Sequence, residues 1–218
     1  MSGRLLVVDT AGPVVGVAAF EGERPVHVAS ERIVNGADGW LLPEVARALD
    51  ALGGLDRVAV SVGPGAFTGL RVGFASALGV ALARGVPVVG LCSLALRAAA
   101  APGEPRVLAW LDARKGRVYA ATFDTRGAVP RALGEPVDIA PGDAAAGASA
   151  LATGEGAVVY AGLLVGAGHR IHVRAAESPV IHAFALAWAA PAVAPGDLAL
   201  AYVRAPDAVP VAERARPS

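Results

Sequence analysis

The sequence is poor in the side chains that most enzyme active sites use. It contains one cysteine, Cys92, and four histidines among 218 residues. A single cysteine excludes an internal disulfide and fits a reducing compartment, where a buried thiol behaves as an ordinary apolar side chain. The histidines form no HExxH pattern, and neither Cys92 nor Ser93 lies in a GxSxG turn. We therefore expect no metal site and no cysteine or serine nucleophile.

The sequence also lacks an excess of charge of either sign. Nineteen basic and nineteen acidic residues cancel, so the positive excess of a protein that holds nucleic acid unaided is missing. The uncharged stretch between Arg71 and Arg84 is well short of the roughly 20 residues that a membrane span needs. The amino terminus reaches Asp9 after an apolar run too short for a signal peptide. We expect a cytoplasmic protein without a membrane span.

The chain does contain ample material for a core, with 55% apolar and only 17% charged residues. Two segments, Val7–Phe20 and Trp110–Phe123, alternate and turn like a pair of strands joined by a tight connection. In each copy a phenylalanine comes eleven residues after an aspartate, Asp9 or Asp112. This repetition predicts two similar lobes, with a boundary near residues 98–106, where two prolines and a glycine follow a helical end.

Residues 58–84 have the pattern of a strand, a glycine-rich loop and a helix. The loop, Gly63–Gly69, stands where backbone amides can hold a phosphate. It lacks the lysine and the hydroxyl residue that follow the last glycine of a Walker loop, and its glycine spacing differs from that of the dinucleotide fingerprint. We favour a tight turn into a closely packed helix over a phosphate site.

The helix that follows carries no charge between Val72 and Ala83. A helix that is apolar all round is buried all round, so one side should pack on its own sheet and the other on a partner protein. Small residues recur in two stripes that would let another helix approach closely: Gly69, Gly73 and Ala77, and Ala75, Gly79 and Ala83. The alternative is a helix enclosed wholly within its own domain.

An amphipathic helix is predicted between Leu41 and Leu52, where apolar residues recur at helical spacing. Pro43 belongs in a first helical turn. Either the helix begins near Leu42, or Asp38 caps an earlier start and one backbone hydrogen bond is missing. Both alternatives agree with the sequence.

Asp9 and Asp112 each end a predicted strand at the entrance to a turn. Two such acids facing one cleft could coordinate a magnesium-bound nucleotide. Aspartate is equally a routine turn former, whose side chain accepts a hydrogen bond from its own backbone. Both interpretations stay open for each residue.

Residues 61–94, SVGPGAFTGLRVGFASALGVALARGVPVVGLCSL, closely resemble the TsaB family, also called YeaZ, of bacterial tRNA threonylcarbamoyladenosine biosynthesis. Further matching motifs are LVVDTA at 6–11, LLPEV at 41–45, LDARKGRVYAATF at 111–123 and YVR at 202–204. Together these motifs span almost the whole chain.

The resemblance implies an α/β fold of two actin-like lobes of the ASKHA, ribonuclease H-like type, each a mixed sheet with flanking helices. The expected division is an N-terminal lobe over 1–102, a smaller lobe over 103–204 and a flexible tail over 205–218. Family members pair with TsaD, an ATP- and metal-binding transferase, through two N-lobe helices. With TsaE as ATPase, TsaD moves a threonylcarbamoyl group onto adenosine 37 of tRNA. The resemblance thus implies a non-catalytic scaffold and activator that meets tRNA through the complex.

The resemblance also implies where a partner binds. The two helices correspond here to residues 41–52 and 69–84, and the expected contact residues are Leu41, Leu42, Val45, Leu49, Gly69, Val72, Gly73, Ser76, Ala77 and Val80. Without TsaD, a homodimer through the same surface is an alternative. Nucleotide-binding candidates are Asp9, Thr10, Asp112 and Arg114.

The chain departs from family patterns at two places. Ala37 stands where the family often has a histidine, and Asp9-Thr10-Ala11 lacks the glycine of the Asp-x-Gly-Thr phosphate loop of related kinases. We therefore expect the isolated chain to need no cofactor, with ATP or ADP at the subunit interface as a candidate ligand. The alternative function is an enzyme in its own right, either a small-molecule kinase using Asp9 and Asp112 or a peptidase-like protein.

Overall fold

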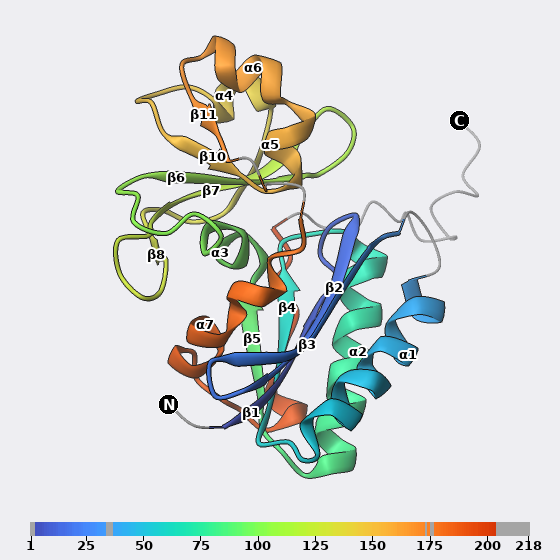
Figure 1. Cartoon of the computed structure of the whole chain (residues 1–218). Helices are drawn as coiled ribbons and strands as arrows, with labels where there is room; N and C mark the ends of the chain where they lie inside the picture. Colours follow the sequence, from blue (N-terminus) through green and yellow to red (C-terminus); the bar gives the residue numbers. More distant parts are fainter. Residues whose placement is uncertain (1–2, 34–36, 173, 175–176, 204–218) are drawn as a thin grey trace, which may run out of the picture.

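The computed structural model of the chain describes residues 3–33, 37–172, 174 and 177–203. These residues form two β-sheets with flanking helices, arranged as two lobes (Figure 1). The predicted fold class, two mixed sheets each with helices beside it, is confirmed. No helix within the described ranges is both long enough and apolar enough to cross a bilayer.

The first sheet has the strand order β3-β2-β1-β4-β5. Its strands are β1 (Arg4–Asp9), β2 (Val14–Glu21), β3 (Arg24–Arg32), β4 (Arg57–Gly63) and β5 (Val88–Cys92). The first three strands are antiparallel neighbours, whereas β4 and β5 run parallel to β1. Nearly every residue of β1 and β2 is buried, so both faces of this sheet must be covered.

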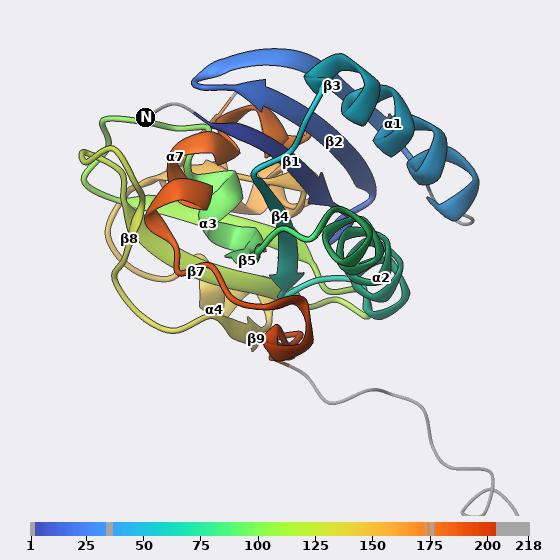
Figure 2. The same cartoon turned by 90° about the horizontal axis from the view of Figure 1, so that it is seen from below.

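Helices cover the first sheet on both sides (Figure 2). On one side lie α1 (Ala37–Leu52) and α2 (Phe67–Arg84), and on the other lie α3 (Ser93–Ala98) and α7 (Ala183–Ala189). Alternation along β1 explains this arrangement, because Leu6 and Val8 enter the core under α1 and α2, while Leu5 and Val7 enter the opposite core.

Helix α1 confirms the predicted amphipathic helix and decides between its two starting points. It begins at Ala37, so Pro43 lies inside the helix and Asp38 is a helical residue rather than the cap. The core side consists of Leu41, Val45, Ala48 and Leu52. Leu42, placed on the apolar side by the sequence pattern, is 56% exposed.

The second sheet repeats the pairing of the first. Its strands are β6 (Val107–Asp112), β7 (Val118–Asp124), β8 (Arg131–Ala132), β9 (Val137–Ile139), β10 (Leu151–Thr153) and β11 (Arg170–Ile171). The order is β11-β10-β6-β7-β8, with β9 also paired to β7. As in the first sheet, the opening hairpin is antiparallel, and two later strands, here β10 and β11, lie parallel to its first strand on the side away from its second strand. The predicted duplication of the hairpin is confirmed.

Short helices accompany the second sheet: α4 (Pro141–Ala144), α5 (Glu155–Val159) and α6 (Ala161–Gly166). Helix α3 lies between the two sheets, where Leu94 and Ala98 share a core with Val107, Ala109 and Leu111 of β6. The lobes are therefore joined by packing through α3 as well as by the chain itself.

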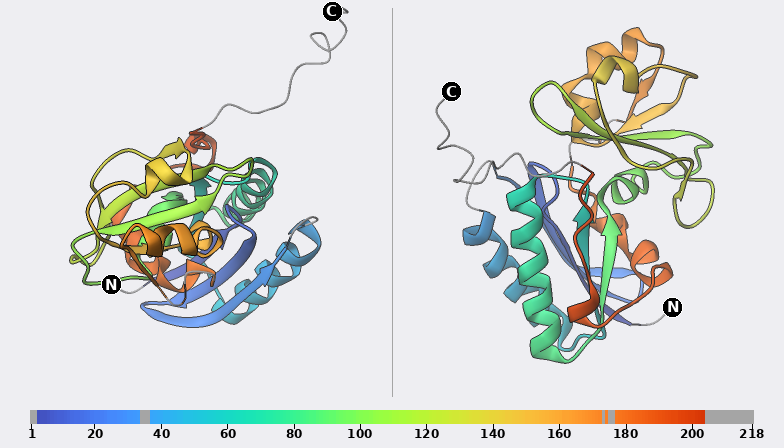
Figure 3. Two further views of the ribbon diagram at one scale, coloured as in Figure 1. Left: turned by 90° about the horizontal axis from the view of Figure 1, so that it is seen from above. Right: turned by 180° about the vertical axis from the view of Figure 1, so that it is seen from behind.

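The predicted domain division is wrong for the last part of the chain, because residues 179–201 return to the first lobe (Figure 3). The 3₁₀ turn η1 (Pro179–His182) and α7 pack on Leu5, Val7 and Phe20 of the first sheet. Further along, Val193 bridges to Val88, η2 (Pro195–Asp197) follows, and the Ala201 N–H donates to the Val62 carbonyl oxygen at 2.8 Å. The predicted tail, 205–218, lies outside the described residues.

The return of the chain to the first lobe predicts the cost of truncating Phe184, which is 7% exposed and contacts the ring of Phe20 at a centroid distance of 5.7 Å. Phe184→Ala should lower the free energy of unfolding by about 3–5 kcal/mol, because it leaves a cavity in the core of the first lobe. Ile181→Ala is the control, since Ile181 is 45% exposed and its truncation should cost no more than about 0.5 kcal/mol. Urea unfolding measures both, and equal costs would contradict this packing.

Candidate functional site

Helix α2 is buried on one side only. Leu70, Gly73, Ala77 and Ala81 are buried against the first sheet. On the opposite side Ala75, Gly79 and Ala83 are exposed, and Leu82 is 68% exposed. The alternative that the chain itself encloses this helix is therefore wrong for its outer side from Ala75 to Ala83, which is exposed among the described residues. Nearer the start of α2, Tyr202 contacts Phe67 and Arg71.

The two stripes of small residues on α2 have different neighbours. A Cβ atom at Gly69 or Gly73 would overlap Thr10, at its carbonyl oxygen and its side chain respectively. This stripe lets α2 approach the turn after β1, which corrects the expectation that it receives a second helix. A Cβ atom at Gly79 would meet nothing within 4 Å. Only the stripe of Ala75, Gly79 and Ala83 faces outward.

The structure separates the ten predicted contact residues into two groups. Four are buried inside the chain and cannot touch a partner, which corrects the prediction for Leu41, Val45, Gly73 and Ala77. Six are exposed or half-buried: Leu42, Leu49, Gly69, Val72, Ser76 and Val80. The helical period also points to Leu82, which the sequence-based prediction missed, and to Ala75, Gly79 and Ala83, which it named as a stripe for a second helix but left out of the list of contact residues.

We call one surface the α1–α2 face, because the two helices lie side by side on the same side of the sheet (Figures 2 and 3). It consists of Leu42, Leu49, Val72, Ala75, Ser76, Gly79, Val80 and Leu82. The Ser76 hydroxyl donates to the Val72 carbonyl oxygen at 2.8 Å, so its polarity is satisfied within the helix. The face is thus apolar in character, although it is solvent-accessible.

The second candidate site lies where β1 ends. Asp9 is fully buried, and both carboxylate oxygens are engaged. Its Oδ1 accepts the backbone N–H of Ala11 at 3.1 Å, and its Oδ2 accepts a hydrogen bond from Arg97 Nη1 at 2.9 Å. This geometry confirms the turn-forming interpretation of Asp9, and each of its oxygens accepts a hydrogen bond from the chain itself.

Arg97 joins Asp9 to the second lobe. Its Nε and Nη2 atoms donate to the two oxygens of Glu155, each at 2.7 Å. Arg97 is 1% exposed and Glu155 is 2% exposed. Burial by itself would lower the pKa of the Arg97 guanidinium, but Asp9 and Glu155 outweigh it and hold this pKa above its ordinary value. Sequence reasoning missed both residues, since nothing in their local pattern marks them as partners.

The other nucleotide candidates are Asp112, Arg114 and Thr10. Asp112 accepts the backbone N–H of Arg114 at 3.0 Å, which confirms the turn-forming interpretation here too. Arg114 is exposed with a φ of 61°, and Thr10 is 1% exposed beside Gly73. Among the described residues, no three histidine, cysteine, aspartate or glutamate side chains lie together in a way that could hold a metal ion.

The glycine-rich loop before α2 is a tight turn, as expected. A Cβ atom at Gly65 would overlap the carbonyl oxygen of Ala11, and one at Gly63 would overlap that of Ala201. The Ala66 N–H donates to the Ala11 carbonyl oxygen at 2.8 Å. The chain itself therefore occupies the space beside these glycines.

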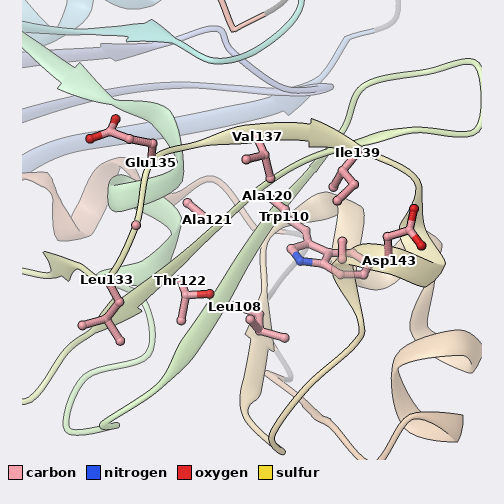
Figure 4. Close-up of a pocket in the computed structure, with 12 residues that line it drawn as sticks. Leu108, Trp110, Ala120, Ala121, Thr122, Leu133, Glu135, Val137, Ile139 and Asp143 are labelled. Carbon is pink, nitrogen blue, oxygen red and sulfur yellow. The ribbon is translucent and has the colours of Figure 1, made fainter.

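A small pocket of about 220 Å³ opens on the second sheet, away from the predicted site residues (Figure 4). Its walls come from β6, β7, β9 and residues 133–135, and include Leu108, Trp110, Thr122, Leu133, Val137 and Ile139. The indole N–H of Trp110 has no hydrogen-bond partner within the described part of the chain. Sites for small molecules are usually larger, at roughly 300–1,000 Å³.

Comparison with known proteins points to the proteins of tRNA threonylcarbamoyladenosine biosynthesis. The family model described as tRNA N6-adenosine threonylcarbamoyltransferase, TsaD, matches residues 39–172. An uncharacterized protein of Mycobacterium tuberculosis is 36% identical over 216 residues, covering 95% of each chain. The tRNA threonylcarbamoyladenosine biosynthesis protein TsaB of Escherichia coli is 35% identical over 127 residues, 55% of this chain and 54% of that protein.

Among solved structures, YeaZ from Pseudomonas aeruginosa matches with a TM-score of 0.78 and 28% identity. The match covers 93% of this chain and 100% of that one. The likeness thus includes both lobes, whereas the sequence match to the Escherichia coli protein spans about half of each chain.

The two glycine environments on α2 give a matched pair of substitutions. Gly73→Ala should destabilise the protein by roughly 1–3 kcal/mol, because the added methyl group overlaps Thr10. Gly79→Ala should stabilise it by up to about 1 kcal/mol, because the position is open and alanine favours the helix. Thermal or urea unfolding compares the two variants. A shift in the same direction for both would show that the two sides of α2 are assigned wrongly.

Proposed function

This chain belongs to the TsaB (YeaZ) family, and on that premise we propose that it is the non-catalytic subunit that binds and activates TsaD in tRNA threonylcarbamoyladenosine biosynthesis. The names of its relatives and the matching family model support a place in this modification of tRNA. One observation carries the finer proposal: the α1–α2 face is apolar, carries no charge on α2 between Arg71 and Arg84, and stays solvent-accessible among the described residues.

Apolar side chains on this face are exposed to water, which is unfavourable in free energy, and this supports a protein partner that would bury them. Leu42 and Leu82 expose 56% and 68% of their surface, and no charged residue interrupts α2 between Arg71 and Arg84. Contiguous apolar surface on a soluble protein commonly marks an interaction site. An interface of standard size buries about 1,600 Å² in total, so each partner contributes about 800 Å².

The outer stripe of α2 fits a helix as the partner element. Ala75, Gly79 and Ala83 project little from the helix, so a second helix can approach its backbone closely. Leu82, next to this stripe, offers a large apolar side chain that could insert between residues of the partner. We infer that TsaD contributes helices of matching apolar character.

The contacts of Asp9 and Asp112 support a subunit without its own catalytic centre. Asp9 is held by Arg97 and by the Ala11 N–H, and Asp112 is held in a local turn. Within our proposal, TsaD carries out the transfer, TsaE acts as ATPase in the larger complex, and tRNA is met through the complex. ATP or ADP between this subunit and TsaD is the candidate ligand.

In the absence of TsaD, we propose that the same face pairs with a second copy of this chain. Light scattering should then give a molar mass that rises toward twice 21.7 kDa with increasing protein concentration. A constant monomer mass at two concentrations tenfold apart would contradict homodimer formation, without bearing on the pairing with TsaD.

The docking proposal is tested by placing a charge on the α1–α2 face. Leu42→Glu and Leu82→Glu should each weaken binding to TsaD by roughly 10-fold or more, because the carboxylate would be buried without a partner. Co-purification with TsaD from the same organism, followed by calorimetry, measures the loss. Val159→Glu is the matched control, since Val159 on α5 is 60% exposed and lies outside the face. Wild-type affinity in both α1–α2 variants would contradict the proposal.

A further inference from the structure

A buried ion triad connects the two lobes. Arg97 on α3 lies between Asp9 at the end of β1 and Glu155 at the start of α5. All three residues are at most 2% exposed. Arg97 Nη1 also donates to the Ser93 carbonyl oxygen at 3.1 Å, which fixes the guanidinium to its own helix. Asp9 and Arg97 are therefore each held by a further hydrogen bond besides those of the triad.

Severing such a triad is costly because one charge would remain buried without compensation. The bidentate contact between Arg97 and Glu155 also fixes an orientation, since the planar guanidinium presents two parallel N–H groups to two oxygens. A Cβ atom at Gly12 would lie 2.9 Å from Arg97 Nη2, so the turn after β1 packs directly on the triad. The position of α5 is thus coupled to this turn.

From Asp9 the contacts continue to the amino end of α2. Asp9 Oδ1 accepts the N–H of Ala11, and the Ala11 carbonyl oxygen accepts the N–H of Ala66. Ala66 is the N-cap residue of α2, and its side chain offers no cap hydrogen bond. The close approach of Gly69 and Gly73 to Thr10 adds a packing contact along the same turn. The start of α2 is held by the β1 turn instead of by a capping side chain.

We propose that Arg97 and Glu155 are positioning residues for the α1–α2 face. Through Asp9 and Ala11 they hold the amino end of α2 in place, so that the second lobe controls how this face is presented to a partner. This inference rests on the proposed function of the face, and it assigns to the second lobe a task that the surface contacts alone do not reveal.

The test removes the contact that Glu155 of the second lobe makes with Arg97 and measures how well the amino end of α2 is held. Glu155→Ala leaves Asp9, Ala11 and Ala66 unchanged. Amide hydrogen exchange of Ala11 and Ala66, followed by NMR on the free full-length chain, should speed up by roughly 10-fold or more. The amide of Val45 in α1 should keep its wild-type rate, because α1 lies outside the chain of contacts. Affinity for TsaD should fall at least about 5-fold by calorimetry.

A matched control removes a glutamate that lies in the second lobe but outside the triad. Glu104 accepts a hydrogen bond from Arg170 at 2.9 Å in an exposed ion pair, and Glu104→Ala should leave the amides of Ala11 and Ala66 at wild-type rates. Glu155→Gln keeps an oxygen that can accept from Arg97, so it should produce a smaller acceleration at the same two amides. If Glu155→Ala does not fold, this variant decides, and unchanged rates in it would then overturn the proposal.

Two results would overturn the coupling in a folded Glu155→Ala variant. One is wild-type exchange at Ala11 and Ala66. The other is an equal acceleration at Val45, which would show a general loss of stability instead of positioning. Because the exchange is measured on the free chain, it is independent of TsaD. Failure of the wild-type chain to bind TsaD would contradict the proposed function and not the coupling.

Discussion

The arrangement of the two lobes depends on the ion pairs that the Arg97 guanidinium forms with Asp9 and Glu155. The guanidinium occupies the position between the end of β1 and the start of α5, with Asp9 on one side and Glu155 on the other. Both acids are buried with this cation, at 0% and 2% exposure. The same arrangement fixes the turn after β1 and, through it, the beginning of α2.

The two sides of helix α2 differ in their surroundings: one packs on the first sheet, and the other is exposed. Its inner side is small at Gly69 and Gly73 so that the helix can lie against Thr10. Between Arg71 and Arg84 its outer side is uncharged and open, because a Cβ atom at Gly79 would meet nothing within 4 Å and Leu82 is largely exposed. A helix that had only to cover its own sheet would carry polar residues on its outer side. Within our proposal, a second protein surface accounts for the absence of charge between Arg71 and Arg84.

Short-range sequence patterns predicted several of the strands and helices. The contacts that they missed join residues far apart in the sequence. Alternation and turn chemistry identified both hairpins, and helical period identified α1 and α2. Arg97 and Glu155 were missed because a basic residue in a last turn and an acidic residue in a first turn satisfy a helix dipole by themselves. Their pairing across 58 residues exists only in the folded chain. Likewise, nothing in the sequence of η1 and α7 reveals that they pack on the first sheet.

The central claim, that the α1–α2 face is covered by TsaD, is tested most directly by mapping which backbone amides become protected when the two purified proteins are mixed. Hydrogen–deuterium exchange read by mass spectrometry should show protection concentrated on residues 38–52 and 67–84, with α5 and α6 unchanged. Protection confined to the second lobe, or none at protein concentrations well above a micromolar dissociation constant, would contradict the account.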